Sequence, residues 1–513
     1  MTARLPLLFE FCSAAVTTRP PSSAHSPRPD GNLTTMLTVT VRVLIFLLVV
    51  ALAIFSFLSW RAWNELQDAL ENAPPLLPTD DVVYSFLTTN YTGQFSGAEW
   101  KKSNAIVVQN EKFITFYPHS GFHNQLIQVE NAIMLAWYTN RTLLLPRALL
   151  GKPFPWSPMS QLRLEHLIHE KTPDGSNAAA CDALRDERGD QMCPNPAEYT
   201  LMPYDELFSF DWVREHVRIQ LREEMSEEWL EKAVGIKRAG VEGKGGSYVD
   251  GDIRYFNGTT RYDWRIFDTF VGGSSNGKYE ARLDVMQLRT FSERLLHFSS
   301  LFGTGKMPVR DPVHFEFLRR LRRSLLYNHP VVLKSAQEVV QRMGGAGKFV
   351  GLHVRTSDGY FARVQQQNIG TILENLHTVN ATAGLPSIPP VLPSNPTVSQ
   401  CLQAASEAGN NLTLVYMATD AQYPRANRIF ASLYNAYPCT FTLGDFLADE
   451  GINWKELRAA RNPYDGVSLE RYFIPMIDAT AAANGRVVIG SKGSTFSGFV
   501  YQMHDVFCRP RNG

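Results

Sequence analysis

The hydrophobic positions of the chain follow two periods, one typical of buried strands and the other of amphipathic helices. Near the start of the first α/β region, the run FITFY at 113–117 predicts a strand, and 125–138 has apolar residues at helical spacing. A second apolar run at 142–145 is closed by Pro146. A strand, a turn with glycine, a helix and another strand in this order predict a βαβ unit.

The same alternation returns after residue 345. An apolar run at 349–353 predicts a buried strand. The further elements that the pattern predicts are helices at 398–408, 425–435 and 467–484, strands at 413–418, 440–443 and 486–490, and a closing helix from Thr495. Two such blocks indicate an α/β fold in which two doubly wound, Rossmann-like domains face a cleft.

Three connecting segments have their own character. Residues 171–200 form a polar insertion, and 235–260 are rich in glycine and are expected to be a loop. Residues 315–343 are expected to be mostly helical, with a break at Pro330.

An apolar run at 43–60, extended upstream to residue 37, predicts one membrane-spanning helix. The residues before the run carry four arginines and two acidic residues, whereas Glu65, Asp68 and Glu71 follow it. The positive-inside rule therefore places the N-terminus in the cytosol. A cleaved signal peptide is the alternative, but the run is long for one and no small-residue cleavage site follows it.

The chain is thus expected to have five parts. They are a disordered cytosolic tail at 1–36, a transmembrane signal anchor at 37–60, a stem at 61–105, an N-terminal α/β domain at 106–345 and a C-terminal α/β domain at 346–513.

Composition excludes one class of partner and suggests a compartment. Lysine plus arginine equals aspartate plus glutamate at 50 each, so bulk charge gives no reason to expect nucleic-acid binding. Cys181 and Cys193 are close enough along the chain to form a disulfide in an oxidising compartment, and Cys401 with Cys439 is a second candidate pair. Beyond the apolar run, five glycosylation sequons begin at Asn90, Asn140, Asn257, Asn380 and Asn411.

The turn SGFHNQ between the first strand and its helix is the first candidate site. Gly121 allows a tight turn, and backbone N–H groups at a helix start can face a ligand. His123, Asn124 and Gln125 place polar side chains on the cleft side, where amides can hydrogen-bond hydroxyls or phosphate oxygens. The alternative is that Asn124 only caps the helix.

The second candidate site is HVRTSD at the end of the predicted strand 349–353. Arg355 lies where open α/β sheets bind ligands, and its planar, permanently charged fork suits a phosphate. The alternative is an arginine that pairs with a carboxylate at the sheet edge. His353 and Asp358 lie on either side of it, and each has an alternative structural role in a buried carbonyl contact or a turn.

Two further strand ends carry polar side chains. Asp420 follows the strand 413–418 and is suited either to a base or ribose or to capping a helix. After the strand 486–490, Ser494 and Thr495 open a helix whose N-terminus and hydroxyls suit phosphate. The spacing of this loop is not that of a nucleotide-hydrolase phosphate loop.

These motifs, in this order, resemble the GDP-fucose protein O-fucosyltransferase family. The resemblance covers roughly 112–505 and rests on GFHNQ, NRTLLLP, HVRTSD, ATD and IGSKGSTFSGF. It implies a GT-B architecture with the donor mainly on the C-terminal domain, and inverting transfer of fucose from GDP-fucose to a hydroxyl of a protein or glycan without a metal. It also implies a single-pass type II membrane protein of the Golgi or endoplasmic reticulum, with the catalytic part in the lumen.

The resemblance assigns roles to individual residues. Arg355 would contact the β-phosphate and assist departure of GDP, and Ser494 and Thr495 would hold the diphosphate. The other residues on the donor side are His353, Asp358, Asp420 and Phe496, and those on the cleft or acceptor side are Gly121, His123, Asn124 and Gln125. Some family members have a catalytic glutamate where this chain has Ser120, so the base is open between His119 and His123.

Two other functions remain open at this point. A metal-dependent glycosyltransferase with another nucleotide sugar would use Asp250-Gly251-Asp252 as its metal-binding pair. A membrane-anchored glycan or peptide binder would keep the scaffold without catalysis, which the missing glutamate allows.

Overall fold

The structure is a computed structural model, and the residues it describes belong to one compact unit of the chain. They are residues 111–152, 155–170, 177–189, 193, 195, 198–241, 243, 246–269, 276–357, 359–382, 392–408, 412–449 and 451–508. The predicted tail, membrane anchor and stem lie outside this set, as does Asp358. Within the described ranges, no helix has both the length and the apolar character that a bilayer span requires.

Six strands form the first sheet, in the order β5-β2-β1-β10-β7-β6. Their bounds are β1 Phe113–Phe116, β2 Thr142–Pro146, β5 Ile219–Arg222, β6 Gly246–Asp250, β7 Ile253–Asn257 and β10 Leu295–Phe298. All neighbours are parallel except β6 and β7, which form an antiparallel hairpin. Helix α2, Phe122–Thr139, connects β1 to β2 and confirms the predicted βαβ unit.

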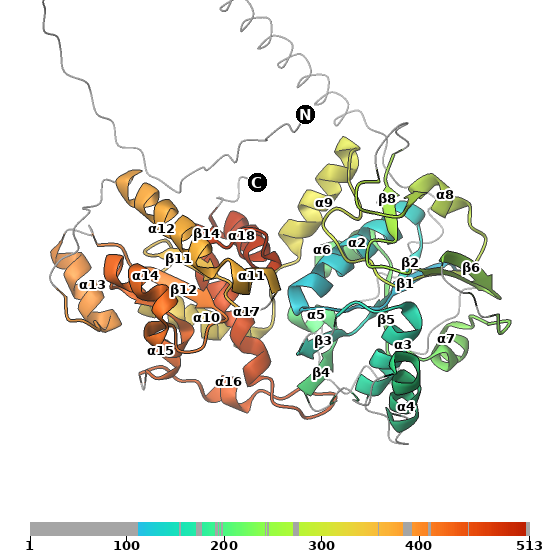
Figure 1. The fold of residues 1–513 in the computed structure, drawn as a ribbon, viewed down its shortest axis with the longest axis horizontal. Coiled ribbons are helices and arrows are strands. Elements are labelled where there is room, and N and C mark those ends of the chain that lie inside the picture. The colour runs from blue at the N-terminus through green and yellow to red at the C-terminus, as the bar shows by residue number, and fades with distance from the viewer. Residues whose placement is uncertain are drawn as a thin grey trace, which may run out of the picture. The chain divides into compact units, whose positions relative to one another are not determined.

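The second sheet has four parallel strands in the order β13-β12-β11-β14. They are β11 Val350–Val354, β12 Val415–Thr419, β13 Thr440–Phe441 and β14 Val487–Gly490. Register pairs His353 of β11 with Ala418 on one side and Gly490 on the other. The carboxyl ends of three strands therefore meet at one edge, as the sequence predicts. Figure 1 shows the first sheet in blue to green and the second in orange to red.

The helices of the unit flank these sheets (Figure 1). The longer ones are α3 Met159–His169, α4 Asn177–Arg188, α7 Glu227–Val234, α9 Pro312–Ser324, α10 Pro330–Arg342, α12 Gln365–Thr382, α13 Val398–Glu407, α17 Glu470–Ala483 and α18 Thr495–Cys508. The short ones are α5 Tyr204–Leu207, α6 Asp211–His216, α8 Val285–Thr290, α11 Gly359–Arg363, α14 Ala431–Ala436, α15 Leu443–Leu447 and α16 Lys455–Ala459, with 3-10 turns η4 Pro424–Ala426 and η5 Arg428–Phe430. Two small sheets pair β3 Ala148–Gly151 with β4 Tyr199–Met202, and β8 Trp264–Phe267 with β9 Ala281–Asp284.

One apolar core runs through both sheet regions. It includes Val129 and Ile133 of α2 together with Phe473 of α17 and Val500 of α18, all of them completely buried. Helix α18 follows the last strand of the second sheet and also contacts α2 and α9. The two α/β regions are therefore packed against each other through α18, and this contact brings the starts of α2 and α18 together.

Two predicted elements differ from the structure. The glycine-rich segment 235–260 contains the β6–β7 hairpin, because Gly251 supplies the left-handed turn conformation (φ +60°) that joins two strands. The helix expected at 425–435 is broken into η4, η5 and α14, since Asn427 accepts a hydrogen bond from the N–H of Ile429 and starts a new turn there.

The cysteine predictions are confirmed. Cys181 pairs with Cys193, and Cys401 pairs with Cys439. Two disulfides are typical of an oxidising compartment such as that of the secretory pathway.

Candidate functional site

The site is built on the edge where β11, β12 and β14 end. Arg355 follows β11 directly, and its backbone N–H donates to Ser491 Oγ, the first side chain after β14, at 2.9 Å. Its guanidinium Nε lies 3.1 Å from Asp420 Oδ2, which follows β12. Arg355 is thus held from both neighbouring strands. It makes the carboxylate pair that the sequence offered as its structural alternative, while about a third of its side chain (31%) stays exposed.

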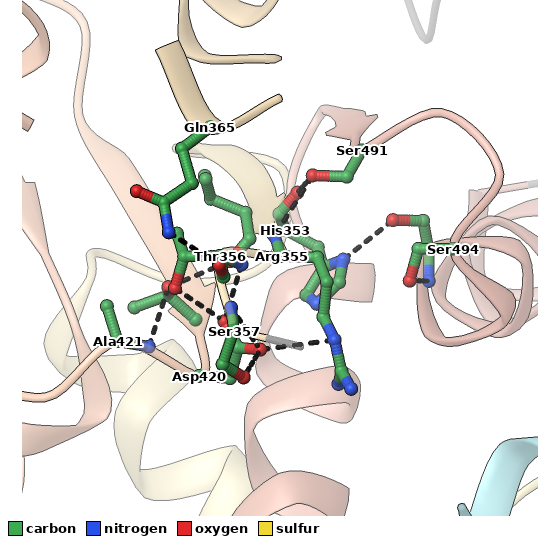
Figure 2. Close-up of polar contacts among 12 residues, drawn as sticks. His353, Arg355, Thr356, Ser357, Gln365, Asp420, Ala421, Ser491 and Ser494 are labelled. Carbon is green, nitrogen blue, oxygen red and sulfur yellow. Dashed lines mark hydrogen bonds and ion pairs between the residues drawn. The ribbon is translucent and has the colours of Figure 1, made fainter. Parts of the chain in front are cut away.

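Asp420 organises the loop that carries Arg355 (Figure 2). Its Oδ1 accepts from the N–H (2.7 Å) and the hydroxyl (2.9 Å) of Thr356, and its Oδ2 accepts from the N–H (3.2 Å) and the hydroxyl of Ser357. Burial opposes ionisation, but the hydrogen bonds from Ser357 and Thr356 and the charge of Arg355 leave the pKa of Asp420 below its ordinary value. Asp420 therefore caps no helix, and its contacts are those of a residue that positions Arg355.

The start of α18 provides the opposite wall of this edge. Ser494 precedes the helix, and its Oγ accepts from the N–H of Ser497 at 3.4 Å. Ser494, Thr495 and Phe496 are half-buried, as expected of residues that line an open site. Figure 2 shows Ser494 at this edge beside the Arg355 loop.

His353 lies beneath the loop and faces α18. Its Nδ1 is 2.6 Å from Ser497 Oγ, its ring stacks on Phe496 with centroids 4.3 Å apart, and only 3% of it is exposed. Burial lowers the pKa of His353 to about 3, so the imidazole is neutral. His353 thus connects β11 to α18, and its stacked ring also fixes the orientation of Phe496.

The turn before α2 differs in detail from the expectation. The left-handed residue is Ser120 (φ 66°), whereas Gly121 has φ −58° and does not use the freedom of glycine. A non-glycine residue in this conformation stores strain of the kind found at functional sites. Asn124 is half-buried in the first turn of α2, and no side chain caps this helix start. The alternative that Asn124 only caps the helix is therefore wrong.

Gln125 is 1% exposed and braces the turn instead of lining a cleft. Its Nε2 donates to the carbonyls of Ser120 and Leu149, both at 2.9 Å, and its Oε1 accepts from the N–H of Leu149 at 3.0 Å. Because these bonds tie the turn to β3, Gln125 supports the position of Asn124 without facing the site.

The two histidines that flank the turn are both buried, in different surroundings. His119 bonds through Nδ1 to Ser120 Oγ (2.8 Å) and through Nε2 to Ser300 Oγ (2.7 Å). His123 bonds through Nε2 to the hydroxyl of Tyr327 at 2.9 Å. Burial lowers the pKa of each to about 3, so both imidazoles are neutral.

A cavity of about 600 Å³ opens beside the start of α18, between α2, α9 and α18. His123 lines it together with Ser494 and Thr495, and Leu126 and Phe315 form part of its apolar wall. The predicted diphosphate-binding hydroxyls and the first turn of α2 thus face one space.

The carboxylates of the Asp250-Gly251-Asp252 triplet are engaged by the neighbouring loop. Asp250 is buried and accepts from Arg238 and from the N–H groups of Ala239 and Val241, and Asp252 accepts from the N–H of Lys237. These bonds hold residues 237–241 against the β6–β7 turn, so the contacts give the triplet a structural role. Among the described side chains, no cluster of three or more histidine, cysteine or acidic residues is arranged to hold a metal ion.

Sequence reasoning missed Ser491 and Tyr327. Ser491 is 2% exposed and also accepts from Asn368 Nδ2 at 2.9 Å, so it fixes both the Arg355 backbone and α12. Because Ser491 is the first residue after the predicted strand 486–490, its hydroxyl could have been predicted to lie at the same sheet edge as Arg355. Tyr327, between α9 and α10, had none, because only tertiary packing brings it to His123.

The chain is similar to a known protein family and to solved structures of low sequence identity. The model of the family described as GDP-fucose protein O-fucosyltransferase matches residues 200–507, more than half of the chain. A crystal structure of POFUT1 in complex with GDP is similar at 14% identity and a TM-score of 0.35, covering 78% of this chain and 96% of that chain. A structure of POFUT1 with GDP-fucose gives 13% identity and a TM-score of 0.33 over 78% and 96% of the two chains. A search among curated proteins found no match.

Proposed function

Because the chain belongs to the GDP-fucose protein O-fucosyltransferase family and is a glycosyltransferase of that family, we propose that it transfers fucose with inversion from GDP-fucose to a hydroxyl of a protein or glycan. We further propose a GT-B arrangement of two α/β domains at 106–345 and 346–513, with the donor on the second. A lumenal position behind an anchor at 37–60 is part of the same proposal.

One observation carries this proposal. Arg355 and the start of α18 follow adjacent parallel strands, and the bond from the Arg355 N–H to Ser491 Oγ joins the two segments at 2.9 Å. A guanidinium and the N-terminus of a 14-residue helix, with two hydroxyls, are complementary to a diphosphate.

These groups would act on the leaving group. As the bond between fucose C1 and the β-phosphate oxygen breaks, its electron pair passes to that oxygen, and negative charge grows on GDP. Arg355 would stabilise this charge, because it is held in place before the reaction by Asp420 and Ser491. The acceptor oxygen attacks C1 from the opposite face, which gives inversion.

The test is Arg355→Ala in the lumenal fragment, with Arg458→Ala on the exposed face of α16 as a matched control. We expect GDP to raise the melting temperature of the wild type and of the control. In Arg355→Ala, release of GDP from GDP-fucose should fall at least a hundredfold, since one charge-stabilising group contributes about 3 kcal/mol to such steps. Unchanged turnover in this variant would refute the proposal.

The same assay separates the alternatives. Fucose transfer that is unaffected by EDTA agrees with the proposal, whereas a requirement for Mn²⁺ would support the metal-dependent transferase. Absence of any GDP-fucose binding in the wild type, measured by calorimetry, would support the non-catalytic binder.

A further inference from the structure

We infer that His123 takes the proton from the acceptor hydroxyl, and that Tyr327 holds its imidazole in place. This inference rests on the proposed fucosyl transfer and names the base which that reaction needs.

The ring of His123 is fixed on three sides. Its Nε2 is 2.9 Å from the Tyr327 hydroxyl, and its centroid is 4.7 Å from that of Phe496 and 5.3 Å from that of Phe499. Tyr327 lies between α9 and α10, and both phenylalanines belong to α18, so the ring is fixed by packing that the N-terminal α/β region cannot supply alone. A catalytic base needs this kind of fixed orientation.

The other nitrogen of His123 is available. Within the described part of the chain, no hydrogen bond uses Nδ1, and His123 lines the 600 Å³ cavity together with Ser494 and Thr495. When Nε2 donates its hydrogen to Tyr327 Oη, the lone pair on Nδ1 is free to accept a proton. Under this inference, the acceptor hydroxyl would approach Nδ1 from this cavity.

Two neighbouring histidines lack this combination. Both nitrogens of His119 are bonded to serine hydroxyls, and the residue is completely buried. His353 bonds Ser497 through Nδ1 and has its ring face covered by Phe496. Of the two candidates that the sequence left open, the geometry favours His123.

The charges around His123 set its protonation. The titratable groups that interact with it are Tyr327, His353 and Arg355. The cavity it lines also contains the charged or titratable side chains of Glu130, Arg319, Arg322, Arg323, Tyr501 and Asp505. Burial is the main cause that lowers the pKa of His123 to about 3, and interaction with the His353 and Arg355 sites adds to it. The ring is therefore neutral, but it is a weak base until negative charge develops beside it. Departing GDP brings negative charge next to Arg355, which favours the imidazolium at the moment it forms.

The proposed step balances as follows. The acceptor oxygen forms a bond to fucose C1, and the C1–O bond to the β-phosphate breaks with its electron pair going to GDP. The acceptor proton moves to His123 Nδ1 and then to water in the cavity. No oxidant, reductant or further reactant takes part.

Because the acceptor is unidentified, the test uses water as the acceptor and measures GDP release from GDP-fucose. His123→Gln keeps a hydrogen-bond partner for Tyr327 but has no basic nitrogen, and His123→Ala leaves room for added imidazole. The control is His377→Gln, which alters another His–Tyr pair (Nδ1 to the Tyr437 hydroxyl, 3.0 Å) on α12.

We expect His123→Gln to lose at least thirtyfold in kcat with an unchanged Kd for GDP, and His377→Gln to match the wild type. Imidazole should restore part of the rate in His123→Ala in proportion to its unprotonated fraction, and Tyr327→Phe should change the pH profile. General-base contributions are about a hundredfold to ten-thousandfold, which makes the effect measurable.

The inference is overturned if His123→Gln turns over at the wild-type rate. It is equally overturned if the variant loses GDP affinity in parallel with turnover, because the residue would then serve donor binding. Failure of the wild type to bind GDP or to release it from GDP-fucose would instead overturn the proposed function, and the assignment of the base with it.

Discussion

At the scale of single residues, the site is organised around the carboxylate of Asp420, whose contacts all come from the protein itself. Asp420 accepts four hydrogen bonds from Thr356 and Ser357 and pairs with Arg355. An arginine side chain loses much conformational freedom when it binds a phosphate, and a side chain that is already held loses less. Under the proposed function, Asp420 would therefore hold Arg355 in position for an anion.

Asp420→Asn tests this role. The new amide nitrogen would face the N–H of Ser357 and the Nε–H of Arg355, which are both donors, so these bonds are lost. We expect GDP affinity to fall about tenfold to a hundredfold, since bonds to charged groups contribute about 1.5–3 kcal/mol. Calorimetry measures the change.

Asp449→Asn is the control for that substitution, because it alters an exposed pair with Arg342 whose atoms are 3.7 Å apart. Exposed pairs contribute little, so GDP affinity should be unchanged there. Equal affinity in Asp420→Asn and wild type would mean that Arg355 is positioned by its backbone bond to Ser491 alone.

At the scale of elements, α17 packs against β11 and β12 and also against α10 and α18, and most of its residues are buried. A Cβ on Gly351 of β11 would lie 2.0 Å from the carbonyl oxygen of Ala482, so only glycine allows this approach. One carboxyl group lies in this interface, that of Asp478, which accepts from the Tyr416 hydroxyl of β12 at 2.5 Å.

Asp478 makes the stability of this interface depend on pH. Burial raises its pKa from 3.8 to about 7, although the bond from Tyr416 opposes the shift. Below about pH 4 both the folded and unfolded states hold the proton, and its contribution to stability is complete. Between about pH 4 and 7 only the folded state holds it, so the free energy of unfolding falls by about 1.4 kcal/mol per pH unit.

Asp478→Asn should remove this dependence. Urea unfolding of the wild type and the variant, each from pH 4 to 8, gives a difference in which the other titrating groups cancel. We expect the variant to gain stability relative to the wild type as the pH rises. A constant difference over this range would show that Asp478 is ionised in the folded protein.

At the scale of the whole molecule, a segment of the second α/β region binds the first. Asn462 Nδ2 donates to Thr200 Oγ1 at 2.5 Å and to the carbonyl of Leu201 at 2.9 Å, and Asp465 accepts from the Thr200 hydroxyl at 2.8 Å. Tyr464 adds a bond to Glu206 of α5. This strap, residues 461–468, lies between α16 and α17 and holds β4 on the first region.

Asn462→Ala should loosen the strap without unfolding either sheet. The residue is 1% exposed, and its loss removes a donor from the buried Thr200 hydroxyl and from the half-buried Leu201 carbonyl. A buried acceptor left unsatisfied costs about 1–3 kcal/mol. Hydrogen exchange should accelerate at 198–206 and 461–468 and stay slow in β11. Asn453→Ala, which alters a solvent-exposed bond to the N–H of Lys455, should leave exchange at both segments unchanged.

Faster exchange throughout the second sheet in Asn462→Ala would contradict this picture, because the strap would then belong to the same cooperative unit as β11 and β14.

The sequence alone determined what depends on local pattern. Hydrophobic period identified β11, β12, β14 and α2, and the position of Arg355 and Ser494 after strands placed both at one sheet edge, because parallel strands share their carboxyl ends. Only tertiary structure decided which polar groups face the site. Gln125 and His353 were buried by neighbouring elements, and His123 met Tyr327, which lies 204 residues away along the chain. A local sequence pattern cannot predict a contact over that separation, because the contact depends on how α2, α9 and α18 pack together.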